Sequence, residues 1–89
     1  MAKPIARDGD STSHGGVVRA ITTKELVNGK LVITIGAIHY CPIPGHGTNN
    51  VIEGSGTVFA EGMAVSRIGD ACTCGATIST GSPDVNAGD

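Results

Sequence analysis

Three segments of this 89-residue chain align on a glycine, and each then carries a metal-ligating side chain at the same distance. The aligned glycines, called the anchor glycines below, are Gly9, Gly36 and Gly69. The residues five positions later are His14, Cys41 and Cys74. Imidazole nitrogen and thiolate sulfur are the donors that zinc prefers. The register therefore predicts that donors from three parts of the chain converge on one metal ion.

Further candidate donors lie close to this set. The residues three positions after the anchor glycines are Thr12, His39 and Cys72, and they share a side with the first set if the segments are extended. His46 follows Cys41 across a Pro-Ile-Pro-Gly loop that can fold back over the site. Register alone favours His14, Cys41 and Cys74 with His46 as the fourth ligand, but the direction of ring closure can equally put His39 in place of Cys41.

Other interpretations of the same residues exist. The thiols could simply be buried, because free cysteine behaves as a small hydrophobic residue, and a Cys41–Cys74 disulfide is disfavoured in a reducing compartment. A thiol or zinc hydrolase would use Cys41 or Cys74 with a histidine, but it needs an open metal position and a walled pocket. Tyr40 and Phe59 are the only aromatic residues. A structural zinc site, in a chain that is not an enzyme, is the preferred interpretation; a free-standing zinc-binding module is the other alternative.

The composition indicates an all-β domain. Val, Ile and Thr contribute 26 residues and Leu only two, a bias toward side chains that suit a pleated sheet. Gly contributes 14 residues, which leaves little room for a helix. The net charge is −2 and the six basic residues are scattered, so a nucleic-acid partner is not expected. A chain of this size has only a marginal core, and a metal would add the missing stability.

Two β-hairpins are predicted from turn signals. Asn28-Gly29 separates 21–23 from 31–35, and Glu61-Gly62 separates 57–60 from 63–68. In both, the turn glycine precedes the anchor glycine by seven residues. The first copy lacks this turn, but residues 85–88 resemble residues 58–62. The third hairpin is therefore predicted to be split between neighbouring chain ends, with three hairpin repeats leaning together about a pseudo-threefold axis as a small cone or prism.

No secretion signal is expected from the N-terminal residues. Met1-Ala2-Lys3-Pro4 is not followed by an apolar run, and no stretch approaches the roughly 20 apolar residues of a membrane span. The chain is expected to be made in the cytoplasm and to remain there at first. Residues 1–89 are expected to form a single domain, with no effector domain fused after Asp89.

The motifs resemble those of the PAAR-repeat proteins over nearly the whole chain. They are His14-Gly15-Gly16, His39-Tyr40-Cys41-Pro42, Gly45-His46-Gly47, Gly54-Ser55, residues 65–70 and Cys74-Gly75. The resemblance implies a small β cone on the blunt end of a trimeric β-helical spike protein of the VgrG type. Such a cone forms the sharp tip of the bacterial type VI secretion apparatus, a contractile injection machine that punctures membranes and delivers effectors.

The resemblance also implies one structural Zn²⁺ near the apex, held by three histidines and one cysteine. Carried over, this selects His14, His39, His46 and Cys74, with Cys41 as the possible substitute. The sequence departs from its own repeat at Ala37, where the other copies have Asp10 and Asp70. Those two aspartates are expected to cap tight turns through their own backbone.

The implied partners follow from the tip role. One copy is expected per spike trimer, with non-covalently bound effectors as possible cargo and with transient contact with the target membrane. The chain would assemble in the cytoplasm and then leave the cell on the spike. Strand residues 32, 34, 58 and 65 are considered as contributors to docking, although the sequence does not say which of them face the partner.

Overall fold

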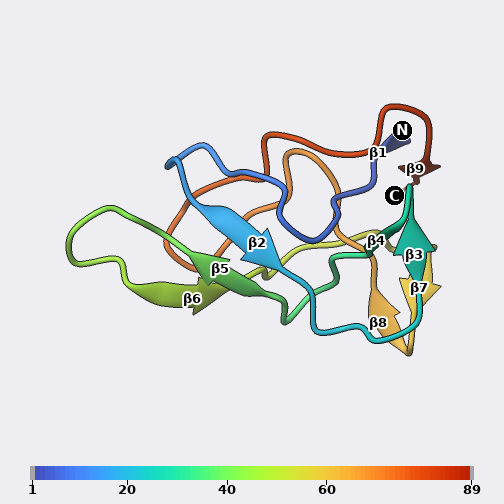
Figure 1. Cartoon of the computed structure of the whole chain (residues 1–89), viewed down its shortest axis with the longest axis horizontal. Coiled ribbons are helices and arrows are strands. Elements are labelled where there is room, and N and C mark those ends of the chain that lie inside the picture. Colours follow the sequence, from blue (N-terminus) through green and yellow to red (C-terminus); the bar gives the residue numbers. More distant parts are fainter. Residues whose placement is uncertain (1, 89) are drawn as a thin grey trace.

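The computed structural model describes residues 2–88, which contain short strands and no helix. This confirms the all-β prediction. The strands are β1 (Lys3–Pro4), β2 (Val17–Arg19), β3 (Leu26–Val27), β4 (Lys30–Leu31), β5 (Ile38–Tyr40), β6 (Thr48–Asn50), β7 (Phe59–Ala60), β8 (Met63–Ala64) and β9 (Asn86–Ala87). The antiparallel pairs β3–β4, β7–β8 and β1–β9 lie at one end, and the sheet β2–β5–β6 extends toward the other (Figure 1).

The two predicted hairpin turns are present. Asn28 and Gly29 have φ values of 54° and 77°, and Glu61 and Gly62 have 51° and 81°. Two successive positive φ values are typical of the tight turns that match the twist of a hairpin. The strands are shorter than expected: residues 21–23 form no strand, and the Thr22 hydroxyl instead donates to the Val32 carbonyl at 2.9 Å.

The third hairpin is split between the chain ends, as predicted. Lys3 pairs with Ala87 in β1–β9, just as Lys30 pairs with Val27 and Met63 with Ala60. Lys3 and Ala87 thus hold the positions that flank the turn in the other two hairpins. Met1 and Asp89 themselves lie outside the described residues.

Backbone hydrogen bonds close the three copies into a ring. The amide of Ala6 donates to Ser66 at 3.0 Å, that of Ser66 to Ile33 at 2.8 Å, and that of Ile33 to Ala6 at 3.0 Å. A second ring consists of the antiparallel pairs Val18–His39, Val51–Cys72 and Ile78–Thr12. Each copy therefore bonds to both others, which confirms the pseudo-threefold arrangement.

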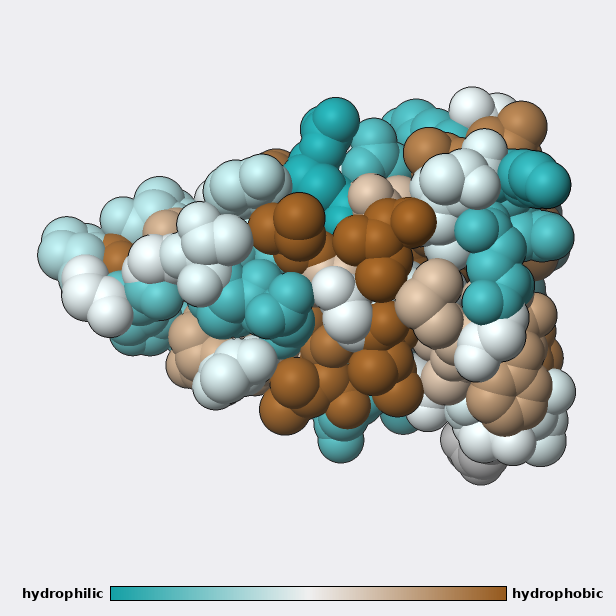
Figure 2. All heavy atoms as spheres, turned by 90° about the horizontal axis from the view of Figure 1, so that it is seen from below, coloured by the Kyte–Doolittle hydropathy of each residue, from teal (hydrophilic) through white to brown (hydrophobic). Residues whose placement is uncertain are grey.

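The molecule narrows toward one end. It measures 33 × 26 × 21 Å along its principal axes, and Figure 2 shows it tapering toward the end where Figure 1 places the connection between β5 and β6. One apolar cluster contains residues of both hydrogen-bonded rings, including Ile33, Val51 and Ile78. A second cluster contains residues of the hairpins, including Ala60 and Ala87. Val32, Thr34 and Val65 are at most 2% exposed. These three residues therefore belong to the interior and are not available for docking.

Buried ion pairs support the turns of the first and third copies. Arg67 Nε lies 3.0 Å from Asp70 Oδ2, with the side chains 7% and 5% exposed, and Arg7 pairs with Asp10 at 3.1 Å. Both aspartates also accept their arginine's own backbone amide at 2.7 Å, which confirms the turn-capping prediction. The second copy has Thr34 and a fully buried Ala37 in their places.

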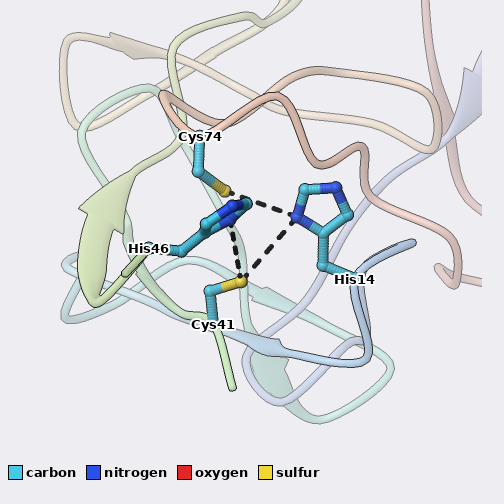
Figure 3. Close-up of side chains that lie close together, drawn as sticks. All are labelled: His14, Cys41, His46 and Cys74. Atoms are coloured by element: carbon cyan, nitrogen blue, oxygen red, sulfur yellow. Dashed lines mark hydrogen bonds between the residues drawn. The ribbon is translucent and has the colours of Figure 1, made fainter. Parts of the chain in front are cut away.

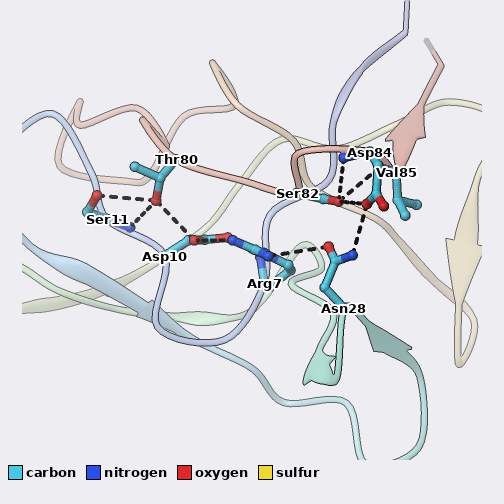
Figure 4. A network of polar contacts seen from close by, with 8 residues as sticks. All are labelled: Arg7, Asp10, Ser11, Asn28, Thr80, Ser82, Asp84 and Val85. Atoms are coloured by element: carbon cyan, nitrogen blue, oxygen red, sulfur yellow. Dashed lines mark hydrogen bonds and ion pairs between the residues drawn. The ribbon is translucent and has the colours of Figure 1, made fainter.

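The Arg7–Asp10 pair continues into a polar network across the chain ends. Thr80 donates to Asp10, and Arg7 reaches Asn28, which in turn donates to Asp84 (Figure 4). Burial alone would raise the pKa of Asp10, but the hydrogen bonds from Arg7 and Thr80 hold this pKa below its ordinary value of 3.8. Asp10 therefore contributes stability above that pH, and the contribution is lost as the pH falls through its native pKa.

Replacing Asp70 by Asn should strongly destabilise the fold, because it removes the carboxylate charge that pairs with the buried Arg67 guanidinium. We expect a loss of about 3 kcal/mol in the free energy of unfolding, measured by urea denaturation at pH 7. The control is Asp8→Asn, which removes an ion pair with the exposed Arg19 and should cost below about 1 kcal/mol. Equal losses in the two variants would contradict the assignment of the buried pair.

Candidate metal centre

Four candidate donors meet at the narrow end of the molecule. His14, Cys41, His46 and Cys74 place one donor atom each within 4.8 Å of one another (Figure 3). All three copies contribute, and the loop after β5 adds His46. This is the set that repeat register alone favours.

Matching turns position His14 and Cys74. Gly15 and Gly75 have φ values of 81° and 92°, which glycine adopts without steric cost. The amide of Gly15 donates to the backbone carbonyl of Thr12 at 2.9 Å, and the amide of Gly75 donates to the backbone carbonyl of Cys72 at 3.0 Å. The residue before each of these glycines therefore points toward the same place.

In the second copy, the longer connection between β5 and β6 takes the place of this turn. Cys41 directly follows β5, and Gly45 and Gly47, with φ values of 89° and 59°, turn the chain back. The amide of His46 donates to the Ile43 carbonyl at 3.1 Å. The loop thereby brings a second donor from the same copy over the site, as the prolines and the glycine of the sequence predicted.

The spacing of the donor atoms fits a tetrahedral zinc ion. Cys41 Sγ lies 3.5 Å from His46 Nδ1 and 3.7 Å from His14 Nδ1, and Cys74 Sγ lies 3.8 Å from His14 Nδ1. Zinc–sulfur and zinc–nitrogen bonds of about 2.3 and 2.0 Å give a tetrahedral edge of about 3.5 Å between sulfur and nitrogen. An ion would therefore require only small movements of the side chains.

His39 lies one layer below these four residues. Its side chain is completely buried; Nε2 is 2.9 Å from Thr12 Oγ1, and Nδ1 is 3.1 Å from Asn49 Oδ1. Nδ1 also lies 3.7 Å from Cys74 Sγ. Of the five side chains considered as ligands, His39 is therefore the one that stands outside the cluster, and Cys41 stands inside it.

Cys72 shares the lower layer with His39. Its side chain is 1% exposed, and burial, aided by the neighbouring thiols, raises its pKa to about 11. It therefore stays protonated at neutral pH and serves as a core residue. All three cysteines are free in the structure, so the alternative of a Cys41–Cys74 disulfide is not adopted.

Two polar neighbours of the site contact His39. Its register with His39 and Cys72 places Thr12 on this side of the repeat, but its role as a hydrogen-bond partner of His39 was not predicted. Asn49 lies directly opposite His39 in the β5–β6 pair. No sequence signal marks Asn49, because the pairing of the two strands depends on the length of the loop between them.

The surface beside the cluster offers little for catalysis. A shallow hollow is lined by residues 15–17 and 40–42, which include no carboxylate or histidine to act as a general base.

Within residues 2–88, the structure has no helix with the length and apolar character required to cross a membrane.

The comparison with protein families gives one match. The family model described as PAAR motif matches residues 8–80, which include all four clustered donors. No curated protein matches the chain.

Alkylation should distinguish the three cysteines. With metal removed by a chelator at pH 7.5, iodoacetamide should modify Cys41 and Cys74, which are partly exposed, and leave Cys72 unmodified in the folded protein. The thiolate is the reactive form, and a pKa of about 11 leaves almost none of it on Cys72. Peptide mass mapping provides the measurement, and unfolded protein is the control in which all three should react. Modification of Cys72 at the rate of Cys74 would contradict its assignment to the core.

Proposed function

The chain belongs to the PAAR-motif family, and from this premise we propose that it forms the sharp tip of a type VI secretion spike. In this role one copy sits on the blunt end of a trimeric VgrG-like β-helical protein. The family match over residues 8–80 carries the proposal. The tip would aid membrane puncture and effector delivery by its shape, without catalysis.

The internal symmetry supports a threefold partner. A single chain can meet three identical subunits equally only if it presents three similar surfaces. The hairpins β3–β4, β7–β8 and β1–β9 supply such surfaces at the wide end of the molecule (Figure 1). In this proposal each of the three hairpins of one tip would meet one of the three spike chains.

Exposed apolar side chains at the wide end support this placement of the docking surface. Leu26 and Phe59 hold equivalent positions in β3 and β7 and are 62% and 61% exposed. Asn86 holds the third equivalent position. Large apolar residues in the middle of an interface commonly provide most of the binding energy, so we assign docking to this end rather than to the tapered end.

We further propose that one structural Zn²⁺ is held by His14, Cys41, His46 and Cys74. The S–N distances of 3.5–3.8 Å support this set. Four protein donors leave no position for water or substrate, which is typical of a structural rather than a catalytic zinc site. When bound, the ion supplies a cross-link among the three copies.

The cross-link would matter mechanically. A tip driven axially into a membrane is pushed to splay, and the core of this chain is small and nearly free of aromatic residues. A metal that ties the three copies together at the narrow end opposes that splaying more strongly than an apolar contact of the same size. The chain would assemble on the spike in the cytoplasm and leave the cell with it.

Zinc removal should lower the melting temperature sharply, because metal binding contributes directly to folding. We expect a zinc-dependent rise in melting temperature for the chelator-treated wild type, measured by calorimetry. This rise should be lost in Cys41→Ser and in Cys74→Ser. Cys72→Ala is the matched control. Its zinc-free form should melt at a lower temperature than the zinc-free wild type, but zinc should raise its melting temperature by the same amount. Full zinc responses in both serine variants would rule out the proposed ligand set.

The partner is tested by native mass spectrometry of the chain mixed with a trimeric spike protein from the same genome. We expect one chain and one zinc on three spike chains. Leu26→Glu combined with Phe59→Glu should weaken the complex at least about tenfold, as expected when apolar anchors of an interface are replaced by charges. Ile52→Glu is the control, because Ile52 is also exposed (53%) but lies outside the three hairpins. A wild-type chain that stays free would overturn the docking proposal.

A further inference from the structure

The hydrogen bonds around His39 determine which of its nitrogens carries the proton. On one side, Thr12 Oγ1 accepts the Gly16 amide at 3.2 Å and lies 2.9 Å from His39 Nε2. On the other side, Asn49 Nδ2 donates to the Gly47 carbonyl at 3.4 Å, which turns Asn49 Oδ1 toward His39 Nδ1. An amide oxygen can only accept, so Nδ1 must donate. Among the described residues, the acceptor for the Thr12 hydroxyl proton is His39 Nε2, so the hydroxyl donates into Nε2 and the ring proton lies on Nδ1.

This tautomer aims a proton at Cys74. The sulfur of Cys74 lies 3.7 Å from the same Nδ1, so the N–H is shared between Asn49 Oδ1 and the sulfur. We propose that His39 is a positioning residue of the metal centre, donating to the Cys74 thiolate and orienting it, rather than a metal ligand. The proposal rests on the metal centre proposed above. A hydrogen bond to a charged sulfur is favourable, and such outer partners hold metal ligands in orientation.

Coordination by His39 would disrupt the buried network. Binding through Nδ1 would move the proton to Nε2, and Thr12 Oγ1 would then accept from both Gly16 and His39. The hydroxyl proton of Thr12, which is 4% exposed, would lose its acceptor, and Asn49 Oδ1 would lose its donor. Leaving these polar atoms without partners would disfavour coordination by His39.

The backbone also holds the His39 ring in the lower layer. β5 is the central strand of its sheet, with His39 paired to Val18 on one side and to Asn49 on the other. A side chain at Gly16 would place its Cβ 2.8 Å from His39 Nε2 and 2.2 Å from the Tyr40 carbonyl oxygen. The ring is therefore packed directly against the backbone of the first copy and cannot shift in that direction.

Nitrogen-15 NMR of the zinc-loaded chain tests the assignment without mutation. Long-range ¹⁵N–¹H correlation spectra report which ring nitrogen of each histidine is protonated. We expect Nδ1–H with a bare Nε2 for His39. His14 and His46, whose Nδ1 atoms face the cluster, should show the opposite pattern. A bare, metal-shifted Nδ1 on His39 would make it a ligand and overturn the inference.

A matched pair of variants tests the positioning role. In His39→Asn the amide N–H can take the place of Nδ1–H, whereas in His39→Gln the amide reaches only the Nε2 position. We expect His39→Gln to weaken zinc binding about 10- to 100-fold in chelator competition, and His39→Asn to stay within a few-fold of wild type. In Co²⁺-loaded samples, both variants should keep tetrahedral bands, and His39→Gln should shift the sulfur-to-cobalt charge-transfer band.

The other outcomes of this experiment are separable. Equal weakening in the two variants, or none in either, would reduce His39 to a packing role and overturn the inference. Loss of the tetrahedral bands in a variant would identify His39 as a ligand. A wild type that binds neither Zn²⁺ nor Co²⁺ would overturn the metal centre itself, and the inference with it. If the wild type binds metal, an unexpected result in the variants overturns only the role proposed for His39.

Discussion

The closed ring of hydrogen bonds among Ala6, Ile33 and Ser66 is the constraint on which the rest of the structure depends. Each copy is too short to bury a face alone, and an isolated two-stranded hairpin is at best marginally stable in water. Closing the ring lets each copy cover the other two, so that a core made largely of Val, Ile and Ala is completely enclosed. The cone shape, the neighbouring chain ends and the meeting of the donors all follow from that closure.

The three copies share this frame but have diverged in what they add to it. The first and third keep a buried Arg–Asp pair beneath the turn that presents a single donor. The second lacks that pair, with Ala37 fully buried in its place, and has a longer turn that carries both Cys41 and His46. The backbones of the three copies are therefore related by a pseudo-threefold axis, but the buried ion pairs and the candidate metal donors are distributed unevenly among the copies.

The narrow end is built in two layers with different chemistry. The upper layer holds the four clustered donors, which are close enough together to share one ion. The lower layer, Thr12, His39 and Cys72, is buried, and the ring of His39 contacts Thr12 on one side and Asn49 and Cys74 on the other. Burial keeps Cys72 a thiol, so the lower layer supports the donors from beneath instead of competing for the metal.

The sequence by itself determined the class of fold, the two hairpin turns, the split third hairpin and the register of His14, Cys41 and Cys74, because turn chemistry and repeat spacing are local properties. The family resemblance put His39 before Cys41 among the candidate ligands, and the spacing of the residues alone left that choice open. Only the tertiary structure decided which of them reached the cluster. His39 lies within β5 and Cys41 directly follows it, so the two residues lie in different layers once the ring closes. The layer of His39 is the one in which Thr12 and Asn49 contact both of its nitrogens.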